Sequence, residues 1–321
     1  MGIVVVSPGP LTLVEDLGRP GWASLGLSPS GALDRQSLRL ANALVGNPAA
    51  SAGLEVLLGG LRLRFVTAST VAVAGAEGIV TLNGTEMPLN QAVRVAPGGT
   101  LNFGPPLFGL RYYLAVQGGI EAPQLLGSRS SDMLSGEGPA PLLAGDQLGI
   151  AGDQLWLAGD QLGIAGDQLG LAGNQLGFGG VSAVPGSGTS RAGNSGSVAA
   201  IRRAPDPRRA IVARVDRGPR ADWFDADSWR RLVTQEWTLS PDSNRIGARL
   251  LGRALTPNRD AELPSEGMVR GALQVPPSGL PTVFLADHPV TGGYPVIAVV
   301  RRSDLDLFGQ ARPGQRIRFL G

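Results

Sequence analysis

The sequence predicts a mainly β protein made of small barrels or sandwiches, with a few short helices. Three observations predict this class: many short apolar runs that alternate or are rich in β-branched residues, turn signals at regular spacing between those runs, and few segments of helical periodicity. A doubly wound sheet is disfavoured, because no glycine-rich phosphate-binding motif lies between a strand and a helix. With 321 residues, the chain is long enough for two domains.

Residues 1–143 are predicted to form an N-terminal β lobe. Strands are expected at LRLRF, TVAVA, IVTL, VRV, LNF and YYLAV, which are residues 61–65, 70–74, 79–82, 93–95, 101–103 and 112–116. One helix is expected to begin at Asp34, where a carboxylate can cap free N–H groups, and to stop at Gly46, just before Pro48. Its predicted inner face contains Leu33, Ser37, Leu40, Ala41 and Leu44.

Residues 144–200 break this pattern and are predicted to be an insertion. Five near-identical heptads of the form AGDQLGI fill residues 144–178, and a Gly/Ser-rich linker follows them. A coiled coil also has a period of seven, but glycine at two of the seven positions disfavours a helix. A calcium-binding β-roll is disfavoured because its repeats are nine residues long. We therefore expect a duplicated strand-and-turn unit that is dispensable for chemistry.

Residues 201–321 are predicted to form a C-terminal β lobe. A strand is expected at AIVARV, residues 210–215, and a helix at SWRRLVTQEW, residues 228–237. This helix is expected to have Asp225 or Asp227 as its cap and to direct four side chains toward the core: Trp229, Leu232, Val233 and Trp237. Near the end of the sequence we expect a short helix capped by Ser303, a turn at Pro313–Gly314 and a strand at 316–319.

The composition excludes several kinds of chemistry. The sequence contains no cysteine, no lysine and one histidine, His288. Disulfides, thiolate metal sites, Schiff bases, a Walker-type lysine and a multi-histidine metal site are therefore excluded. Carboxylates, arginines, hydroxyls, amides and backbone N–H groups remain.

The charge and hydropathy of the chain predict neither a nucleic-acid nor a membrane partner. The net charge is only +2, and the densest basic patch, residues 201–210, is broken by proline. No apolar run reaches the ~18 residues needed to span a bilayer, and the first residues do not resemble a signal peptide. A cytoplasmic protein is therefore expected.

Three clusters of residues could carry chemistry. SPSGALDRQSLRLAN offers Asp34 and Arg35 as an acid–guanidinium pair, or only an ordinary helix cap with a surface ion pair. SPDSNRIGARL delivers Arg245, which could bind a carboxylate or phosphate or could belong to a structural turn. In the third cluster, the run Thr291–Gly293 could present consecutive N–H groups to an oxyanion or carboxylate.

Eight motifs in order resemble one known family: SGALDR with LANALVGNP, LEVLLGG, LAVQGGI, GSRSSDMLSG, SEGMVRGALQVPPSG, DHPVTGGYPVIAVV and DLDLFGQARPGQRIRF. This is the allophanate hydrolase subunit 2 family, also called the carboxyltransferase subdomain A and B family. Each motif alone is weak, whereas the ordered set is specific and covers the chain outside residues 144–200. The resemblance implies two cyclophilin-like β-barrel lobes that share a cleft.

The resemblance also implies an activity and partners. The family includes the C subunit of 5-oxoprolinase, so the chain is expected to be a subunit of an ATP-dependent complex that hydrolyses the lactam of 5-oxoproline to glutamate. Its partners would be a subunit-1-type (KipI-like) protein and a LamB/YcsF-type subunit, with ATP and Mg²⁺ bound at the level of the complex. Two alternatives are a biotin-dependent carboxyltransferase of the urea carboxylase type and a non-catalytic KipA-like regulator that binds a kinase-inhibitor protein.

Matching the family motifs residue by residue implies a set of site residues. Four are expected to be catalytic: Asp34, Arg245, Glu266 and Asp287. Eight are expected to bind substrate: Arg35, Ser128, Arg129, Gln274, Thr291, Gly292, Gly293 and Tyr294. Arginines would neutralise a substrate carboxylate or phosphate, acids would transfer protons or hold a metal-bound water, and glycine amides would stabilise an oxyanion. No residue is assigned as a direct metal ligand.

The sequence departs from the family pattern at two positions. Val296 stands where the family often has lysine, and Asn244 stands where an aspartate is common. Both departures weaken a carboxyl-transfer function more than lactam opening. His288, beside Asp287, could titrate near neutral pH, but the backbone around it is the better candidate for chemistry.

Overall fold

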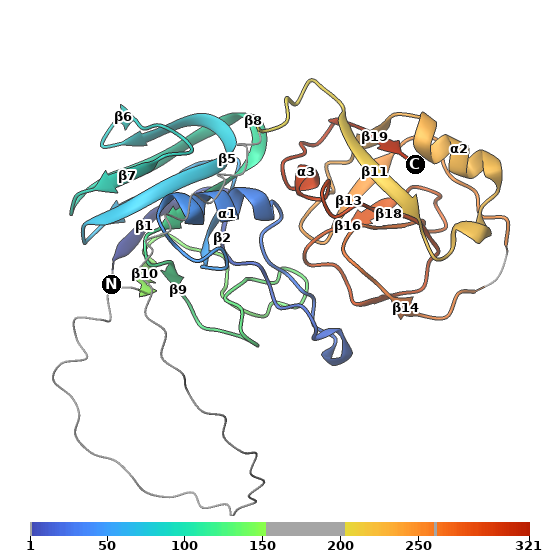
Figure 1. Ribbon diagram of the computed structural model, residues 1–321, viewed down its shortest axis with the longest axis horizontal. Helices are drawn as coiled ribbons and strands as arrows, with labels where there is room; N and C mark the ends of the chain where they lie inside the picture. The colour runs from blue at the N-terminus through green and yellow to red at the C-terminus, as the bar shows by residue number, and fades with distance from the viewer. Residues whose placement is uncertain (1, 152–202, 260–261) are drawn as a thin grey trace, which may run out of the picture. The chain divides into compact units, whose positions relative to one another are not determined.

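The computed structural model describes residues 2–151, 203–259 and 262–321 (Figure 1). Most of the predicted insertion, including four of the five heptads, lies outside the described residues, so its structure stays a prediction. Both lobes belong to one compact unit. Within the described ranges, no helix is long and apolar enough to cross a membrane.

The N-terminal lobe is built on a ten-stranded sheet. Its main path runs β2-β3-β8-β4-β1-β10-β9, and β5 pairs with β6, β7 and β8. The strands are β1 (Ile3–Pro8), β2 (Leu11–Glu15), β3 (Gly53–Leu57), β4 (Leu61–Phe65), β5 (Ser69–Leu82), β6 (Thr85–Glu86), β7 (Ala92–Val95), β8 (Thr100–Val116), β9 (Ile120–Glu121) and β10 (Gln147–Ile150).

Strands β5 and β8 are longer than the sequence predicted. The expected strands at 70–74 and 79–82 are one strand, and so are those at 101–103 and 112–116. The intervening glycines and prolines indicated turns, but the β5–β8 ladder passes through them with register shifts near Gly75 and Gly78. Gly75 has a φ of 90°, which a β-bulge can use and which most other residues avoid.

Strand β10 shows that the N-terminal lobe extends beyond the predicted boundary at residue 143. Gln147 and Leu148 pair with Val4 and Ile3 of β1, and Gly149 pairs with Glu121 of β9. The first heptad therefore forms an antiparallel strand of the N-terminal sheet, rather than part of a separate insertion. A deletion meant to remove only the repeats should begin after residue 151.

The C-terminal lobe is a closed barrel with the strand order β11-β18-β15-β16-β13-β12-β19. These strands are β11 (Ile211–Arg217), β12 (Trp237–Leu239), β13 (Gly247–Leu251), β15 (Ala272–Gln274), β16 (Thr282–Phe284), β18 (Val296–Val300) and β19 (Arg316–Leu320). A separate pair is formed by β14 (Glu266–Gly267) and β17 (Thr291–Gly292). Alternate residues of β11 and β19 are buried, as expected for a barrel filled by inward side chains. The prediction of a mainly β chain with barrel-like lobes is confirmed.

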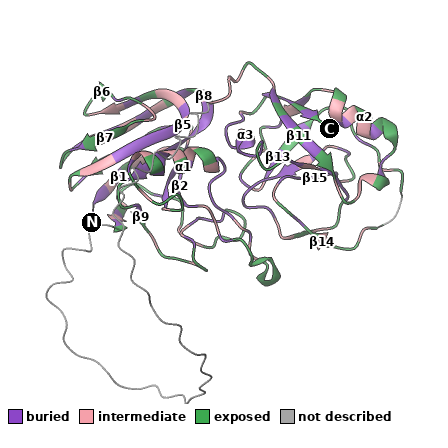
Figure 2. Cartoon of the chain, viewed as in Figure 1, coloured by how far each residue is buried: buried purple, intermediate pink, exposed green. Residues whose placement is uncertain are grey.

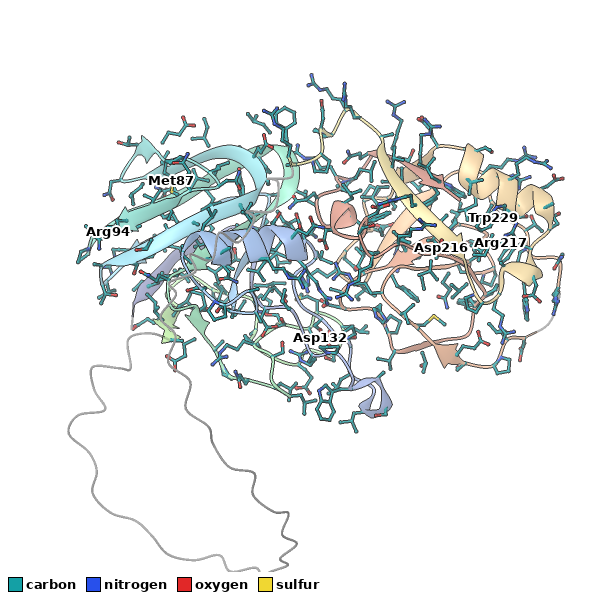
Figure 3. All side chains as sticks on the ribbon, viewed as in Figure 1. Met87, Arg94, Asp132, Asp216, Arg217 and Trp229 are labelled. Atoms are coloured by element: carbon teal, nitrogen blue, oxygen red, sulfur yellow. The ribbon has the colours of Figure 1, made fainter. Side chains whose placement is uncertain are left out.

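The helices lie against these sheets. Helix α1 (Arg35–Leu44) contacts β5 and β8, and α2 (Ala226–Thr234) contacts β19 (Figure 1). The described residues also form three short helices: η1 (Ala23–Leu25), η3 (Ala221–Trp223) and α3 (Asp306–Gly309). Asp34 and Asp225 cap α1 and α2 through the Ser37 and Ser228 N–H groups, which confirms both predicted caps. On the barrel, the Arg217 guanidinium lies 4.3 Å from the Trp229 ring centre (Figure 3).

Three predictions about the helices were wrong in whole or in part. The helix expected at 228–237 ends at Thr234, so the buried Trp237 lies on strand β12 instead. The predicted face of α1 is confirmed in part: Ala41 is buried, and Leu40 and Leu44 pack beside it. Leu38 and Asn42 are buried as well, because the helix packs on two strands, and Asn42 donates to the Ser51 carbonyl and accepts from Asn47. Ser303 does not cap α3. Its hydroxyl accepts a hydrogen bond from Arg214 instead, and α3 has no side-chain cap.

Each lobe has its own hydrophobic core. The N-terminal core gathers around the strands of the large sheet, and the C-terminal core fills the barrel (Figure 2). One N-terminal residue, Leu33, is fully buried in the C-terminal core. The segment just before α1 therefore anchors one lobe in the core of the other.

Candidate functional site

The two lobes are joined around the buried side chain of Arg245, which lies between β12 and β13. Its Nε and Nη2 donate to Asp287 at 2.8 and 3.0 Å, and Nη2 also donates to the Gly31 carbonyl at 2.8 Å. Its Nη1 donates to Glu55 Oε1 on β3 at 2.7 Å. The Arg245 side chain of the C-terminal barrel is therefore hydrogen-bonded directly to the N-terminal lobe.

Glu55 is held in its charged form at this junction. Its carboxylate also lies 3.2 Å from Nε of Arg111, so two guanidinium groups face it. Burial acts to raise the pKa of Glu55, but Arg245 and Arg111 outweigh burial and keep the pKa below its ordinary value. Glu55 is thus an anion that pairs with both lobes.

Glu15 occupies the same junction in a different state. Its Oε1 lies 3.1 Å from Arg245 Nη2, but neither of its carboxyl oxygens has a hydrogen-bond partner among the described residues. Burial raises the pKa of Glu15 well above its usual range despite Arg245, and Glu55 and Asp287 add to the rise. With Glu15 neutral, the anions Glu55 and Asp287 balance the cations Arg245 and Arg111.

Arg245 and Asp287, two of the predicted catalytic residues, therefore lie together, but most of their hydrogen-bonding groups are already paired within the protein. Asp287 is fully buried and also accepts a hydrogen bond from the Met133 N–H at 3.1 Å. Four of the five guanidinium N–H groups of Arg245 are donated within the protein, which leaves little capacity to hold a substrate. Their catalytic role remains a prediction, whereas the geometry gives them a role in joining the lobes.

Asp34 and Arg35 lie at the start of α1, close to the same seam. Asp34 accepts hydrogen bonds from the Ser37 N–H and hydroxyl, and from Nε2 of Gln310 in the other lobe at 2.9 Å. Burial raises the pKa of Asp34, and Asp306 adds to the rise. Asp34 is thus a helix cap that also bridges the lobes. Arg35 donates to the Ser30 carbonyl at 3.2 Å.

Ser128 and Arg129 belong to a loop that is organised by Asp16. The Ser128 and Ser130 hydroxyls each donate to Asp16 Oδ1 at 2.7 Å, and the Arg129 N–H donates to Oδ2 at 2.7 Å. Arg19 from the N-terminal lobe donates to the Ser130 carbonyl. The GSRSS motif therefore provides a buried anchor for its own loop. The predicted contact of Ser128 with substrate remains untested.

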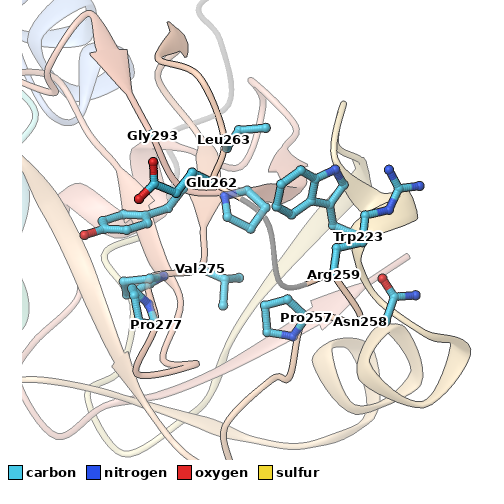
Figure 4. Close-up of a pocket in the computed structure, with 12 residues that line it drawn as sticks. Trp223, Pro257, Asn258, Arg259, Glu262, Leu263, Val275, Pro277 and Gly293 are labelled. Atoms are coloured by element: carbon cyan, nitrogen blue, oxygen red, sulfur yellow. The ribbon is translucent and has the colours of Figure 1, made fainter.

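Two of the remaining predicted residues, Gly293 and Tyr294, line a pocket of the C-terminal barrel (Figure 4). The pocket has a volume of about 860 Å³, which falls within the range of small-molecule sites. Gly293 and Tyr294 line it together with Trp223, Pro257, Asn258, Arg259, Glu262, Leu263, Val275, Pro276, Pro277 and Pro295. Prolines form much of the wall, while Arg259 and Glu262 supply opposite charges.

The segment next to this pocket leaves little space for a side chain at position 292. Gly292 pairs with Glu266 across β14 and β17, and Gln274 Nε2 donates to the Tyr294 carbonyl at 3.3 Å. A Cβ atom on Gly292 would lie only 2.5 Å from Gln274 Nε2. Glu266 pairs with Arg220, and the hydrogen bond from Arg220 outweighs burial and holds the pKa of Glu266 below its ordinary value. Glu266, Gln274, Thr291 and Gly292 thus support the pocket wall rather than the Arg245 junction.

His288 is buried, and its ring is held by a hydrogen bond and by stacking on a neighbouring ring. Its Nδ1 lies 2.8 Å from the Pro289 carbonyl, and its ring stacks on Phe284 with centres 6.0 Å apart. Because a carbonyl only accepts, Nδ1 carries the proton in the neutral ring. Burial lowers the pKa of His288. The histidine is therefore neutral at pH 7, in agreement with the view that the backbone around it is the better candidate.

A second cavity, of about 360 Å³, lies between the lobes. It is lined mainly by apolar side chains from both lobes, including Leu57, Leu239 and Phe308, with Arg111 and Arg245 at its wall. Within the part of the chain that the structure describes, no group of three or more acidic or histidine side chains is arranged to hold a metal ion.

Sequence reasoning missed Glu15, Glu55 and Arg259. Glu55 interrupts the apolar strand GLEVL and Glu15 ends the apolar strand LTLVE, and all the other residues of these two strands except two are buried. A carboxylate within such a run is a usable signal, because an unpaired charge is costly to bury. Arg259 sits in a loop of ordinary composition, and nothing in its neighbourhood indicated a pocket.

Comparison with known protein families places these features in context. Residues 25–320 match the family model described as carboxyltransferase domain, subdomain A and B. The chain is 33% identical to the C subunit of 5-oxoprolinase from Escherichia coli, over 98% of this chain and 90% of that protein. It is 33% identical to the same subunit from Haemophilus influenzae, over 95% and 86%. It is 30% identical to urea amidolyase of Saccharomyces cerevisiae, over 99% of this chain but 16% of that protein.

Solved structures show the same fold. The crystal structure of TTHA0988 has a TM-score of 0.77 at 35% identity, and this chain covers 55% of its length. The crystal structure of Kluyveromyces lactis urea carboxylase has a TM-score of 0.79 at 28% identity, and this chain covers 27% of its length. The family match spans most of the sequence and both described lobes. The chain therefore belongs to the carboxyltransferase domain, subdomain A and B, family.

Proposed function

We propose that this chain is a subunit of an ATP-dependent 5-oxoprolinase complex, which opens the lactam of 5-oxoproline to give glutamate. The observation that carries the proposal is the 33% identity to the C subunit of 5-oxoprolinase from Escherichia coli, which extends over 98% of this chain and 90% of that protein. The partners would be a KipI-like subunit and a LamB/YcsF-type subunit. ATP and Mg²⁺ would be bound by the complex.

The pocket of the C-terminal barrel suits a substrate of this kind. 5-Oxoproline is a small five-membered ring with a carboxylate and an amide N–H. Proline and valine walls can pack on the ring, Arg259 can attract the carboxylate, and Glu262 can accept from the amide. Lactam opening places negative charge on the amide oxygen, where backbone N–H groups near Gly293 would be favourable.

A biotin-dependent carboxyltransferase is the second candidate, because the chain also resembles urea amidolyase and urea carboxylase. Val296 disfavours it. This residue begins β18 and is 3% exposed, within a small apolar cluster that includes Met268 and Phe284. No titratable group is available at the position where the family often has lysine.

The proposal is tested by reconstitution. The purified chain, its two partner subunits, ATP and 5-oxoproline should together form glutamate, and omission of this chain should abolish the product. Tyr294→Ala should lower kcat/KM by about tenfold or more, because Tyr294 lines the pocket and a misplaced substrate loses rate steeply. Glutamate should be measured directly by chromatography.

Leu251→Ala is the matched control, because Leu251 is an exposed apolar residue of β13 that does not line the pocket. It should leave kcat/KM unchanged. Glutamate formation that continues undiminished without this chain would rule out the proposed function. Carboxylation of urea by the chain with a biotin carrier would instead support the second candidate.

A further inference from the structure

Two arginines, one from each lobe, converge on the segment that leads into α1. Arg35, the first residue of α1, donates through Nη2 to the Ser30 carbonyl at 3.2 Å. Arg270, just before β15 in the barrel, donates through Nη2 to the Leu33 carbonyl at 2.6 Å. Both guanidinium groups therefore lie against the same short stretch, residues 30–33, at the seam between the lobes.

Each of these arginines has a buried N–H group without a partner. The Nε atoms of Arg35 and Arg270 are both inaccessible to solvent and make no hydrogen bond with the described residues. Buried side-chain N–H groups almost always have a partner, so two in one place need an explanation. The side chain of Arg270 is 11% exposed and Arg35 is half-buried, so solvent reaches part of each side chain, although not the two Nε atoms.

The surroundings carry an excess of positive charge. The pKa of Arg35 is lowered to about 10, first by burial and then by Arg270, Arg302 and Arg39, against the opposing effect of Asp306. Asp306 lies 3.7 Å from Arg270, beyond hydrogen-bond distance, and its Oδ2 accepts from the Gln36 N–H. The nearby Asp34 carboxylate is already used by Ser37 and Gln310.

These charges are arranged like an anion site. Arg35, Arg39, Arg270 and Arg302 are opposed by Asp306, which pairs with Arg270 at 3.7 Å and also accepts from the Gln36 N–H, so positive charge is in excess there. Arg39 and Arg302 are exposed, so they can attract an anion toward the half-buried pair. Guanidinium groups match the oxygens of phosphate in a planar, forked geometry, and burial strengthens such charge-assisted bonds.

We propose that Arg35 and Arg270 form a binding site for a phosphoryl group, with Arg39 and Arg302 at its entrance. The bound group can be free phosphate or the terminal phosphoryl group of a nucleotide, since both present the same oxygens. The site is inferred from these contacts and does not depend on the proposed function. If the chain acts in an ATP-dependent reaction, the site could bind the phosphate of that reaction.

The test measures binding of sodium phosphate and of ATP to the full-length chain by calorimetry, at constant ionic strength. The wild-type chain should bind, and Arg35→Gln and Arg270→Gln should each weaken binding by ~10-fold or more, as expected from loss of a charged hydrogen bond. Binding of phosphate alone identifies a free-phosphate site, and at least tenfold tighter binding of ATP identifies the nucleotide as the source. Both results support the site.

Three further variants separate this role from a structural one. Asp306→Asn removes a competing negative charge, so it should strengthen phosphate binding several-fold, which a damaged fold would not do. Arg302→Gln should weaken binding a few-fold. Because Arg302 is exposed, this variant should fold even if Arg270→Gln does not, so the test does not depend on Arg270→Gln. Arg301→Gln is the matched control, because Arg301 is the adjacent arginine and pairs with Asp216 at 2.8 Å.

The proposal is overturned if neither anion binds the wild-type chain. It is equally overturned if Arg35→Gln and Arg302→Gln bind as tightly as the wild type, since this would place the bound anion elsewhere on the chain. Weakening by Arg301→Gln as large as that by Arg35→Gln would also overturn it, since this would indicate a general effect of net charge. Phosphate binding that depends on Arg35 in a chain that fails reconstitution would contradict the 5-oxoprolinase function alone.

Discussion

Replacement of Arg245 by methionine should lower the free energy of unfolding by about 3–5 kcal/mol at pH 7, because it leaves buried anions without their cation. Arg245 is 2% exposed, makes ion pairs with Glu55 and Asp287, and lies 3.1 Å from the neutral Glu15. Glu55 would keep Arg111 as a partner, whereas Asp287 would lose both bonds to a guanidinium group. Asp287 should therefore dominate the loss.

Urea unfolding followed by fluorescence measures this effect. Arg301→Met is the control, since Arg301 pairs with Asp216 at an exposed position and such pairs contribute ~0–1 kcal/mol. The destabilisation of Arg245→Met should shrink as the pH falls, because protonation of the stranded acids removes their charge. A loss below that of Arg301→Met would show that the junction does not hold the lobes together.

This result would change how loss of activity at Arg245 is interpreted. Arg245 was predicted to be catalytic from its motif, and an inactive variant would agree with that prediction. However, a variant with separated lobes would also be inactive. The two causes differ in the unfolding experiment, so activity and stability of Arg245 and Asp287 variants have to be measured together.

Local features of the fold could be predicted from the sequence because their causes lie within a few residues. The caps at Asp34 and Asp225 depend on an N–H group three positions away, and the alternation of 316–319 appears directly as strand β19. The continuity of β5 could not be predicted. A glycine such as Gly75 is compatible with both a turn and a bulge, and only the neighbouring strand decides between them.

Only part of the candidate site could be predicted, because some of its contacts join residues that lie far apart in the sequence. The motifs predicted Arg245 and Asp287, which are 42 positions apart, as catalytic residues, and Gly293 and Tyr294 as substrate-binding residues. The structure brings the first two into contact and places the other two on a pocket wall, while their roles stay predictions. The sequence placed all of these residues in one cleft, whereas the structure separates them into a buried junction and a barrel pocket. Glu55, 190 positions from Arg245, has no local signal for its partner. Such pairs are set by the packing of the lobes.

Glu15→Gln and Glu55→Gln should change stability in opposite directions, although both remove one buried carboxylate from the same junction. Glu55 has a pKa below its ordinary value, so its ionised form stabilises the fold above the unfolded pKa, and this contribution is lost as the pH falls. Glu55→Gln should therefore lower the free energy of unfolding by about 3–5 kcal/mol at pH 7, since it weakens contacts to Arg245 and Arg111.

The contribution of Glu15 to the pH dependence of stability has the opposite sign to that of Glu55, because the pKa of Glu15 is raised in the folded protein. The folded state then binds more protons than the unfolded state between the unfolded pKa, about 4.3, and the raised pKa, so stability falls as the pH rises through that window. Glutamine mimics the neutral acid without this dependence. Glu15→Gln should therefore raise the free energy of unfolding at pH 7, because it removes the cost of keeping a carboxyl group protonated above its unfolded pKa.

Urea unfolding of both variants at about pH 4.5 and pH 7 separates these effects, because the two pH values bracket the window above the unfolded pKa of a glutamate. The advantage of Glu15→Gln over the wild type should be largest at neutral pH and should nearly vanish at the acidic pH, where Glu15 is protonated in the folded wild type and largely so in the unfolded chain. The deficit of Glu55→Gln should likewise be larger at neutral pH. If both variants were destabilised equally, Glu15 would be an anion in the folded protein. The junction would then hold three negative charges against Arg245 and Arg111, and the balance of charge inferred from its geometry would be wrong.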